Sequence, residues 1–275
     1  MCIPKFRKCC RVRRSCKIGI GSGFTMIELL TVIALISMLT AMIVGMAGPA
    51  TSKMRIARIQ AELSNISTAI DYYRNWYKVY PPDNQTRINN SNPYSGLVEG
   101  CSATNQLLLE LSGCILTNNA FYSPYVTTPN GQSKTINQGE MEGLFGMPVE
   151  GILNANAQAN KVRNFIDNYS ERKLGRMTNA ARSLVFRMFR VPAPAPYYQA
   201  GRTPQGKEWR KLPDNPWHYN SSAPTNNPGK YDLWAEFQLM RQDAILKDEQ
   251  GRQYIEYYVI GNWNDMKPEI RREYF

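Results

Sequence analysis

The chain has 275 residues, of which 43% are hydrophobic, and its formal net charge is +11. This length accommodates one medium-sized domain and an additional membrane helix. Seven of the positive charges lie in residues 1–23, which contain no acidic residue, so the remainder of the chain carries only about +4. This distribution, together with the lack of any RNP, zinc-finger or helix-turn-helix pattern, argues against nucleic-acid binding.

The first predicted element is an apolar helix that begins directly after Gly23. From Phe24 to Met46 the only charged residue is Glu28. Roughly 20 consecutive apolar residues are long enough to cross a bilayer as a helix. A carboxylate inside such a run is costly in lipid, which marks it as functional. The basic segment in front predicts an N-terminus that stays in the cytoplasm; a conventional secretory signal is the alternative, but its apolar core would be shorter.

The segment 23–29 resembles the class III signal of type IV pilins and type II secretion pseudopilins, with Met26 where leucine is commonest. The resemblance implies that a prepilin peptidase cuts between Gly23 and Phe24 and that the new amine of Phe24 is methylated. It further implies that Glu28 pairs with this amine in a neighbouring subunit and sets the register of a filament. The same amine and carboxylate could also pair within one chain, and a buried, protonated Glu28 without a partner is a further alternative.

An amphipathic helix is predicted over residues 50–78. Apolar residues recur at steps of three and four, which defines one apolar face. These residues are Ile56, Ile59, Leu63, Ile66, Ile70, Tyr73 and Tyr77. The prolines after Tyr80 end the helix, and a helix ending in tyrosine-proline is similar to that of major pseudopilins. The face is expected to pack on a small sheet rather than to form a coiled coil.

The middle of the chain, residues 84–200, is the least informative. Residues 103–111 predict a short helix, 118–160 loops, 155–172 a helix and 183–191 a strand. Most of this region is interpreted as an insertion. Cys101 and Cys114 are the two cysteines that remain after the leader, and an even pair in an oxidising compartment suggests a disulfide; two buried thiols are the alternative.

The C-terminal part, from residue 203, contains two turn signals around Asp214 and Asn227, then strand candidates at 231–239 and 254–260 joined by a turn at 248–251. It resembles the D-P-W, N-P-G and I-G-N-W segments of major pseudopilins. Residues 266–275 are interpreted as a charged tail.

The same region contains the candidate residues for calcium binding and the single histidine of the chain. In that family a loop near the last strands often binds calcium, but the expected Gly- and Asp-rich loop is replaced here. Only Asp243, Asp248 and Glu249 remain as weak calcium candidates. The single histidine, His218, is expected to be a packed or surface aromatic. No catalytic, zinc or nucleotide motif occurs, so we expect no enzyme and no cofactor.

The predicted fold class is α+β, with a long N-terminal transmembrane and amphipathic helix packed on a small antiparallel sheet, as in pilins, and a loop-rich insertion. The predicted divisions are a cleaved leader (1–23), a membrane helix (24–48), an amphipathic helix (49–80), an insertion (81–202) and a C-terminal sheet region (203–275).

The resemblance implies a single-pass protein of the bacterial inner membrane, with its body in the periplasm, that polymerises into the pseudopilus of a type II protein secretion system. Its implied partners are further copies of itself, the prepilin peptidase, a platform protein, an assembly ATPase and minor pseudopilins. A type IV pilus or competence pilin is the first alternative. The second is a membrane-anchored binding protein that never polymerises.

Overall fold

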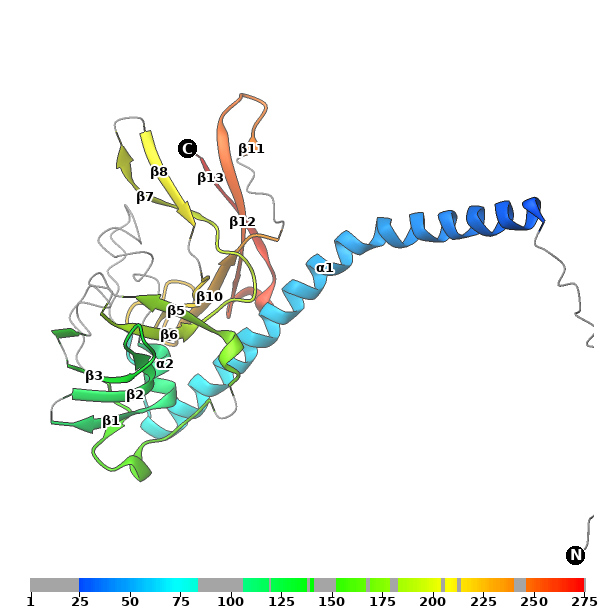
Figure 1. Ribbon diagram of the computed structural model, residues 1–275. Coiled ribbons are helices and arrows are strands. Elements are labelled where there is room, and N and C mark those ends of the chain that lie inside the picture. Colours follow the sequence, from blue (N-terminus) through cyan, green and yellow to red (C-terminus); the bar gives the residue numbers. More distant parts are fainter. Residues whose placement is uncertain are drawn as a thin grey trace, which may run out of the picture. The chain divides into compact units, whose positions relative to one another are not determined.

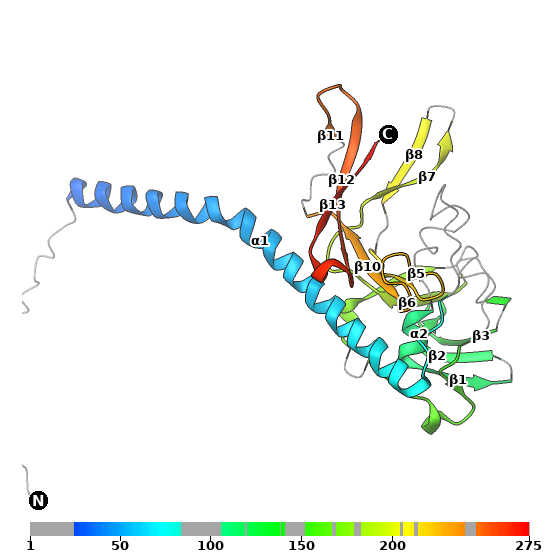
Figure 2. The ribbon, with the colours of Figure 1, turned by 180° about the vertical axis from the view of Figure 1, so that it is seen from behind.

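The computed structural model describes residues 25–83, 106–118, 120–137, 139–140, 152–166, 169–178, 183–203, 206–211, 214–239 and 246–274. The chain divides into two compact units, Met1–Gly48 and Pro49–Phe275. All the described strands belong to the second unit (Figures 1 and 2).

Helix α1 (Met26–Tyr77) supplies one side of the core of the second unit with its C-terminal part. The predicted apolar face is confirmed from Ile59 to Tyr73, where Ile59, Leu63, Ile66, Ile70 and Tyr73 are all buried. Spacings of three and four residues place these side chains on one face of the helix, which packs against the sheets. Polar contacts reinforce this packing: the Glu62 carboxylate pairs with Lys173 at 3.2 Å.

The end of α1 is tied to the neighbouring sheet. Lys78 adopts a positive φ of 65°, and the prolines that follow prevent the helix from continuing. The carbonyl of Pro81 accepts a hydrogen bond from the Tyr219 hydroxyl at 2.8 Å. The carboxylate of Asp83 accepts hydrogen bonds from the backbone N–H groups of Ser221 and Ser222. The residues after the helix are therefore held by hydrogen bonds, in addition to the packing that holds the apolar face of the helix.

The first sheet has six strands in the order β4-β1-β2-β6-β5, with β3 paired to β2. Its pairs are antiparallel except β1 with β4. A short helix, α2, precedes it. The bounds are α2 (Leu107–Ser112), β1 (Cys114–Thr117), β2 (Ala120–Thr127), β3 (Ser133–Asn137), β4 (Ala155–Asn156), β5 (Leu174–Thr178) and β6 (Val185–Phe189).

The second sheet has five strands in the order β11-β12-β10-β9, with β13 paired to β12, and all of its pairs are antiparallel. Strands β7 and β8 form a separate two-stranded hairpin. The bounds are β7 (Tyr197–Thr203), β8 (Gly206–Lys211), β9 (His218–Asn220), β10 (Asp232–Phe237), β11 (Leu246–Lys247), β12 (Gln253–Gly261) and β13 (Glu269–Tyr274). Three short 3₁₀ turns are η2 (Ala159–Lys161), η3 (Glu171–Lys173) and η4 (Asn264–Met266).

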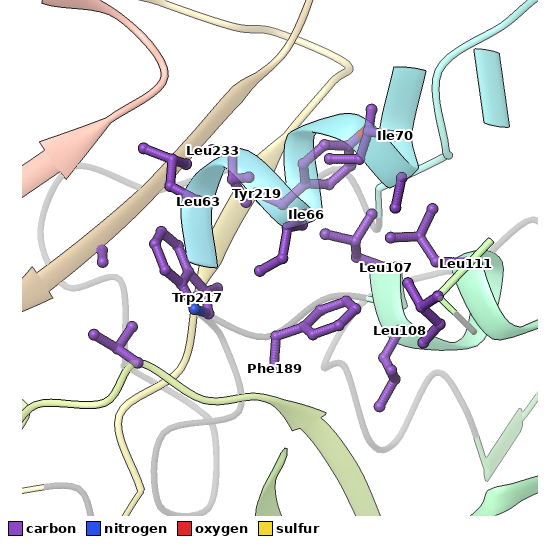
Figure 3. Packing of buried hydrophobic residues seen from close by; sticks show 14 of the residues in the cluster. Leu63, Ile66, Ile70, Leu107, Leu108, Leu111, Phe189, Trp217, Tyr219 and Leu233 are labelled. Carbon is purple, nitrogen blue, oxygen red and sulfur yellow. The ribbon is translucent and has the colours of Figure 1, made fainter. Parts of the chain in front are cut away.

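Two hydrophobic clusters hold the unit together. The larger one lies between α1, α2 and the second sheet. Figure 3 shows Leu63 and Ile66 of α1 near Trp217, and Leu107 of α2 on the side of Ile66 that faces away from Trp217. The smaller cluster lies under the first sheet and includes Leu109 of α2. Because neighbouring leucines of α2 contribute to different clusters, this short helix joins the two halves of the core.

The predicted fold class is wrong. The body is a mixed α/β structure with sheets of six and five strands, where one small sheet was expected. The region interpreted as a loop-rich insertion forms the entire first sheet and contributes its own hydrophobic cluster. Among the residues that the structure describes, no helix combines the length and the apolar content that crossing a bilayer requires.

Several local predictions are also corrected. The predicted loops at 118–160 contain β2 and β3, and the predicted helix at 155–172 consists of β4, η2 and η3. The backbone N–H groups of Arg163 and Phe165 donate to Asn154 Oδ1 and the Leu111 carbonyl, so they are not available for helical bonds.

The predicted tail at 266–275 contains the end of η4 and strand β13, because β12 offers an open edge for pairing. The predicted strands near 183–191, 231–239 and 254–260 and the short helix near 103–111 are confirmed as β6, β10, β12 and α2.

Candidate functional site

The N-terminus of α1 carries the residues that the sequence singles out for processing and assembly. Gly23 and Phe24 lie outside the described residues. Thr25 and Glu28 form a reciprocal pair: the Thr25 backbone N–H and hydroxyl each donate to Glu28 Oε2 at 2.8 Å, and the Glu28 N–H donates to the Thr25 hydroxyl at 3.3 Å. This is a capping box, in which two side chains satisfy free N–H groups at a helix start. Glu28 therefore has a local structural role in addition to the predicted assembly role.

The helix that follows this cap presents an apolar surface. Residues 25–42 are all exposed, and their large apolar side chains are between 46% and 81% exposed. These side chains are Met26, Ile27, Leu29, Leu30, Val32, Ile33, Leu35, Ile36, Met38, Leu39 and Met42. The hydroxyls of Ser37 and Thr40 donate to carbonyls one turn earlier, so they place no unsatisfied donor on this surface. An exposed apolar surface that surrounds a helix requires another molecule or a lipid phase to cover it.

Within the second unit, a buried carboxylate, Glu110 of α2, is the centre of a hydrogen-bond network. Glu110 is fully buried. Its Oε1 accepts from Gln106 Nε2 at 3.1 Å and the Leu153 N–H at 2.9 Å, while its Oε2 accepts from the Tyr73 hydroxyl at 2.9 Å and the Asn154 N–H at 3.0 Å. Burial nevertheless raises the pKa of Glu110 to about 7, because the hydrogen bonds compensate only part of the desolvation of the charge. This carboxyl group joins α1, α2 and residues 153–154.

Asn154 extends this network to the surface. Its side-chain amide donates to the carbonyls of Glu110 at 2.7 Å and Arg163 at 2.6 Å, and its Oδ1 accepts from the Arg163 N–H at 3.2 Å and the Tyr77 hydroxyl at 2.8 Å. The backbone of Arg163 is thus held on both its N–H and its C=O. The Arg163 guanidinium lies over the ring of Trp76, with Cζ 3.5 Å from the ring centroid.

The close approach at Asn154 depends on Gly113, which has a φ of +76°. A Cβ at this position would lie 2.1 Å from Val162 Cγ1 and 3.0 Å from Asn154 Nδ2. We expect Gly113→Ala to lower the free energy of unfolding by about 2–4 kcal/mol, because it combines backbone strain with a steric clash. Urea unfolding followed by circular dichroism measures this change.

A matched control for this prediction is Gly131→Ala. Gly131 has a similar φ of +81°, but no atom lies within 4 Å of the added Cβ. We expect Gly131→Ala to lower the free energy of unfolding by only about 1 kcal/mol, because it strains the backbone without causing a clash. If the two alanine variants lose the same stability, the clash at Gly113 does not contribute.

The remaining predicted site residues do not come together. Asp243 lies outside the described residues. The Asp248 carboxylate makes hydrogen bonds within its own turn. Its Oδ1 accepts from the N–H groups of Gln250 and Arg252, and its Oδ2 pairs with the Arg252 side chain at 2.7 Å. Glu249 is exposed. Within the described parts of the chain, no cluster of three or more His, Cys, Asp or Glu side chains has the arrangement of a metal site.

The single histidine and the cysteine of the body are structural in this fold. His218 is buried and stacks on Trp234 with a centroid separation of 5.0 Å, and burial lowers its pKa, which favours neutral imidazole. This confirms the expectation of a packed aromatic. Cys114 is buried and forms no disulfide with another described residue, and burial raises the pKa of its thiol to about 12. Cys101 lies outside the described residues, so the disulfide between them stays a prediction.

The N-P-G and I-G-N-W segments, which carry part of the family resemblance, form one turn-and-strand assembly. The Asp232 carboxylate accepts hydrogen bonds from the N–H groups of Thr225, Asn226 and Asn227. Asn262 then accepts from the Leu233 N–H and donates to the Tyr231 carbonyl. The polar residues of these two segments therefore fix the entry to β10 against the end of β12.

Sequence reasoning missed Glu110, Asn154 and Arg163. A glutamate in the leucine-rich run 107–111 was a usable signal, because ionisable residues are almost never fully buried without partners. Asn154 and Arg163 lie in an unremarkable polar stretch, and nothing local indicates their contacts. Searches of family models, curated proteins and solved structures found no match to this chain.

Proposed function

We propose that this chain is a structural subunit of a secretion pseudopilus, which polymerises through the N-terminal part of α1. The observation that carries the proposal is the exposed apolar surface of residues 26–42, which begins within the 23–29 motif. Burying such side chains against equivalent helices of other subunits is favourable by about 25 cal/mol per Å² of apolar surface. Before assembly, the same surface holds the subunit at the bacterial inner membrane.

The proposal assigns a role to each part of the chain. After cleavage, the amine of Phe24 and the carboxylate of Glu28 form an intersubunit pair that sets the axial register. The second unit forms the outer, periplasmic part of the filament. The proposed partners are the prepilin peptidase, the platform protein, the assembly ATPase and minor pseudopilins, and the proposed role is neither enzymatic nor dependent on a cofactor.

The test is the N-terminal sequence and intact mass of the protein recovered from native membranes. We expect the chain to begin at Phe24 and to carry about 14 Da for one added methyl group. A chain that begins at Met1 contradicts the proposal. That outcome would favour the alternative of a membrane-anchored binding protein, whereas long surface fibres built from a processed chain would favour the type IV pilus alternative.

A further inference from the structure

A surface cavity of about 520 Å³ lies beside the C-terminal end of α1. It combines aromatic rings with amide groups and one cation. The lining residues are Tyr72, Asn75, Trp76, Arg163, Asn164 and Phe165. All of them belong to the second unit, so the cavity does not depend on the placement of residues 26–42. Its volume lies within the usual range of ligand pockets, about 300–1,000 Å³.

The cation in this cavity is held in place by its surroundings. The Asn154 amide fixes the backbone of Arg163, and the Phe165 N–H donates to the Leu111 carbonyl at 2.8 Å. The ring of Phe165 also packs on Tyr73, with centroids 5.3 Å apart. The guanidinium lies over the ring of Trp76, with Cζ 3.5 Å from the ring centroid, and this contact limits its movement. A guanidinium that is oriented before binding loses less freedom when it pairs with an anion.

Arg163 has no carboxylate partner within the described residues. The hydrogen bonds of Arg163 in this part of the chain involve only its backbone, and no salt bridge there includes its side chain. Tyr72 and Trp76 are also 61% and 55% exposed, which is unusual for aromatic side chains one helical turn apart. The cavity therefore offers an exposed cation and exposed aromatic rings together.

We propose that this cavity binds an acidic peptide segment of a partner protein. One Asp or Glu side chain of the segment pairs with Arg163, and apolar side chains on either side of it pack on Tyr72 and Trp76. Charge complementarity supports this occupant, because the guanidinium over Trp76 leaves its N–H edge for a planar carboxylate. The amides of Asn75 and Asn164 can exchange hydrogen bonds with a peptide backbone. Among the described residues that line the cavity, Arg163 is the only cation, so a phosphate dianion would find no second one there.

The experiment is isothermal titration calorimetry of the full chain in a mild non-ionic detergent. The probe is acetyl-Phe-Glu-Phe-amide, and acetyl-Phe-Gln-Phe-amide is its uncharged control. We expect the Glu peptide to bind at least about tenfold more tightly than the Gln peptide, because a charge-assisted pair is lost in the control. Arg163→Gln is expected to remove this difference, and Arg163→Lys to retain only part of it.

The matched control variant is Arg172→Gln, which removes the same charge from an exposed arginine outside the cavity. We expect it to bind both peptides as the unaltered chain does. Equal affinity for the two peptides, unchanged affinity in Arg163→Gln, or equally tight binding of acetate alone would each overturn the proposal. The peptide comparison on the unaltered chain decides the question even if a variant fails to fold. This inference does not rest on filament assembly.

Discussion

Replacing Glu28 with glutamine is expected to reduce filament assembly by more than tenfold while leaving the start of α1 intact. In the structure, Glu28 Oε2 accepts hydrogen bonds from both the N–H and the hydroxyl of Thr25. A glutamine carbonyl can accept the same bonds, so the capping box is retained. What is lost is the negative charge, which our proposal pairs with the amine of Phe24 in an apolar surrounding, where an unpaired charge is costly.

The matched control is Thr25→Ala, which removes the hydroxyl of the capping box and keeps the Glu28 carboxylate. Loss of an N-cap costs about 0.5–2 kcal/mol of helix stability, but the proposed intersubunit pair remains. We therefore expect Thr25→Ala to assemble at close to the normal level. The measurement is the yield of pelleted filaments relative to total protein, with membrane recovery of each variant checked in parallel. If Glu28→Gln assembles normally, or if Thr25→Ala fails equally, Glu28 acts only as a helix cap.

Removing the Glu110 carboxylate is expected to destabilise the second unit by about 3–5 kcal/mol, because breaking a buried polar network leaves several groups unpaired. In Glu110→Ala, the Tyr73 hydroxyl, Gln106 amide and Leu153 and Asn154 N–H groups all lose their acceptor. The control is Tyr73→Phe, which deletes one donor and keeps the other three bonds. We expect this variant to lose only about 1 kcal/mol.

Urea unfolding at constant pH measures both variants. The large loss in Glu110→Ala should be accompanied by weaker docking of residues 152–166, because Asn154 receives its position from Glu110 through two hydrogen bonds. Hydrogen exchange of the Phe165 N–H, which donates to the Leu111 carbonyl, reports this docking. A loss below about 1 kcal/mol in Glu110→Ala would show that water replaces the carboxylate.

Glu110 also gives a defined pH dependence. Its pKa in the folded protein is about 7, against an ordinary value of 4.5. Between these values the folded state holds a proton that the unfolded state has released. The contribution of Glu110 to stability is therefore most favourable below pH 4.5 and becomes less favourable as the pH rises to about 7, by a total on the order of 3 kcal/mol.

The comparison that isolates this contribution is with Glu110→Gln, which does not titrate. We expect the stability difference between the unaltered chain and Glu110→Gln to change by this amount between pH 4.5 and 8. In the protonated state the new proton is accepted by the oxygen of Tyr73 or of the Gln106 amide, since the Leu153 and Asn154 N–H groups can only donate. A difference that is constant with pH would mean that Glu110 keeps an ordinary pKa in the fold.

The sequence alone identified the apolar face of α1, the end of α1 at its prolines, and the strands β6, β10 and β12. Each of these elements buries one face or a short apolar run, so the spacing of its apolar residues records its environment. The sequence also singled out Glu28, because a single charge in an apolar run is visible without any structure.

Only the tertiary structure decided that strands β1 to β6, between residues 114 and 189, form one sheet with its own core, and that residues 269–274 form an edge strand. Strands β1, β2 and β3 pair with their neighbours in the chain, but the sheet also requires β2 to pair with β6, as at Val126 and Phe186, and β1 with β4, as at Cys114 and Ala155. Local sequence patterns do not record these distant pairings. The same holds for the site. Glu110 and Asn154 bind backbone groups up to 44 residues away, and the cavity around Arg163 exists only because these bonds bring a polar loop against the end of α1.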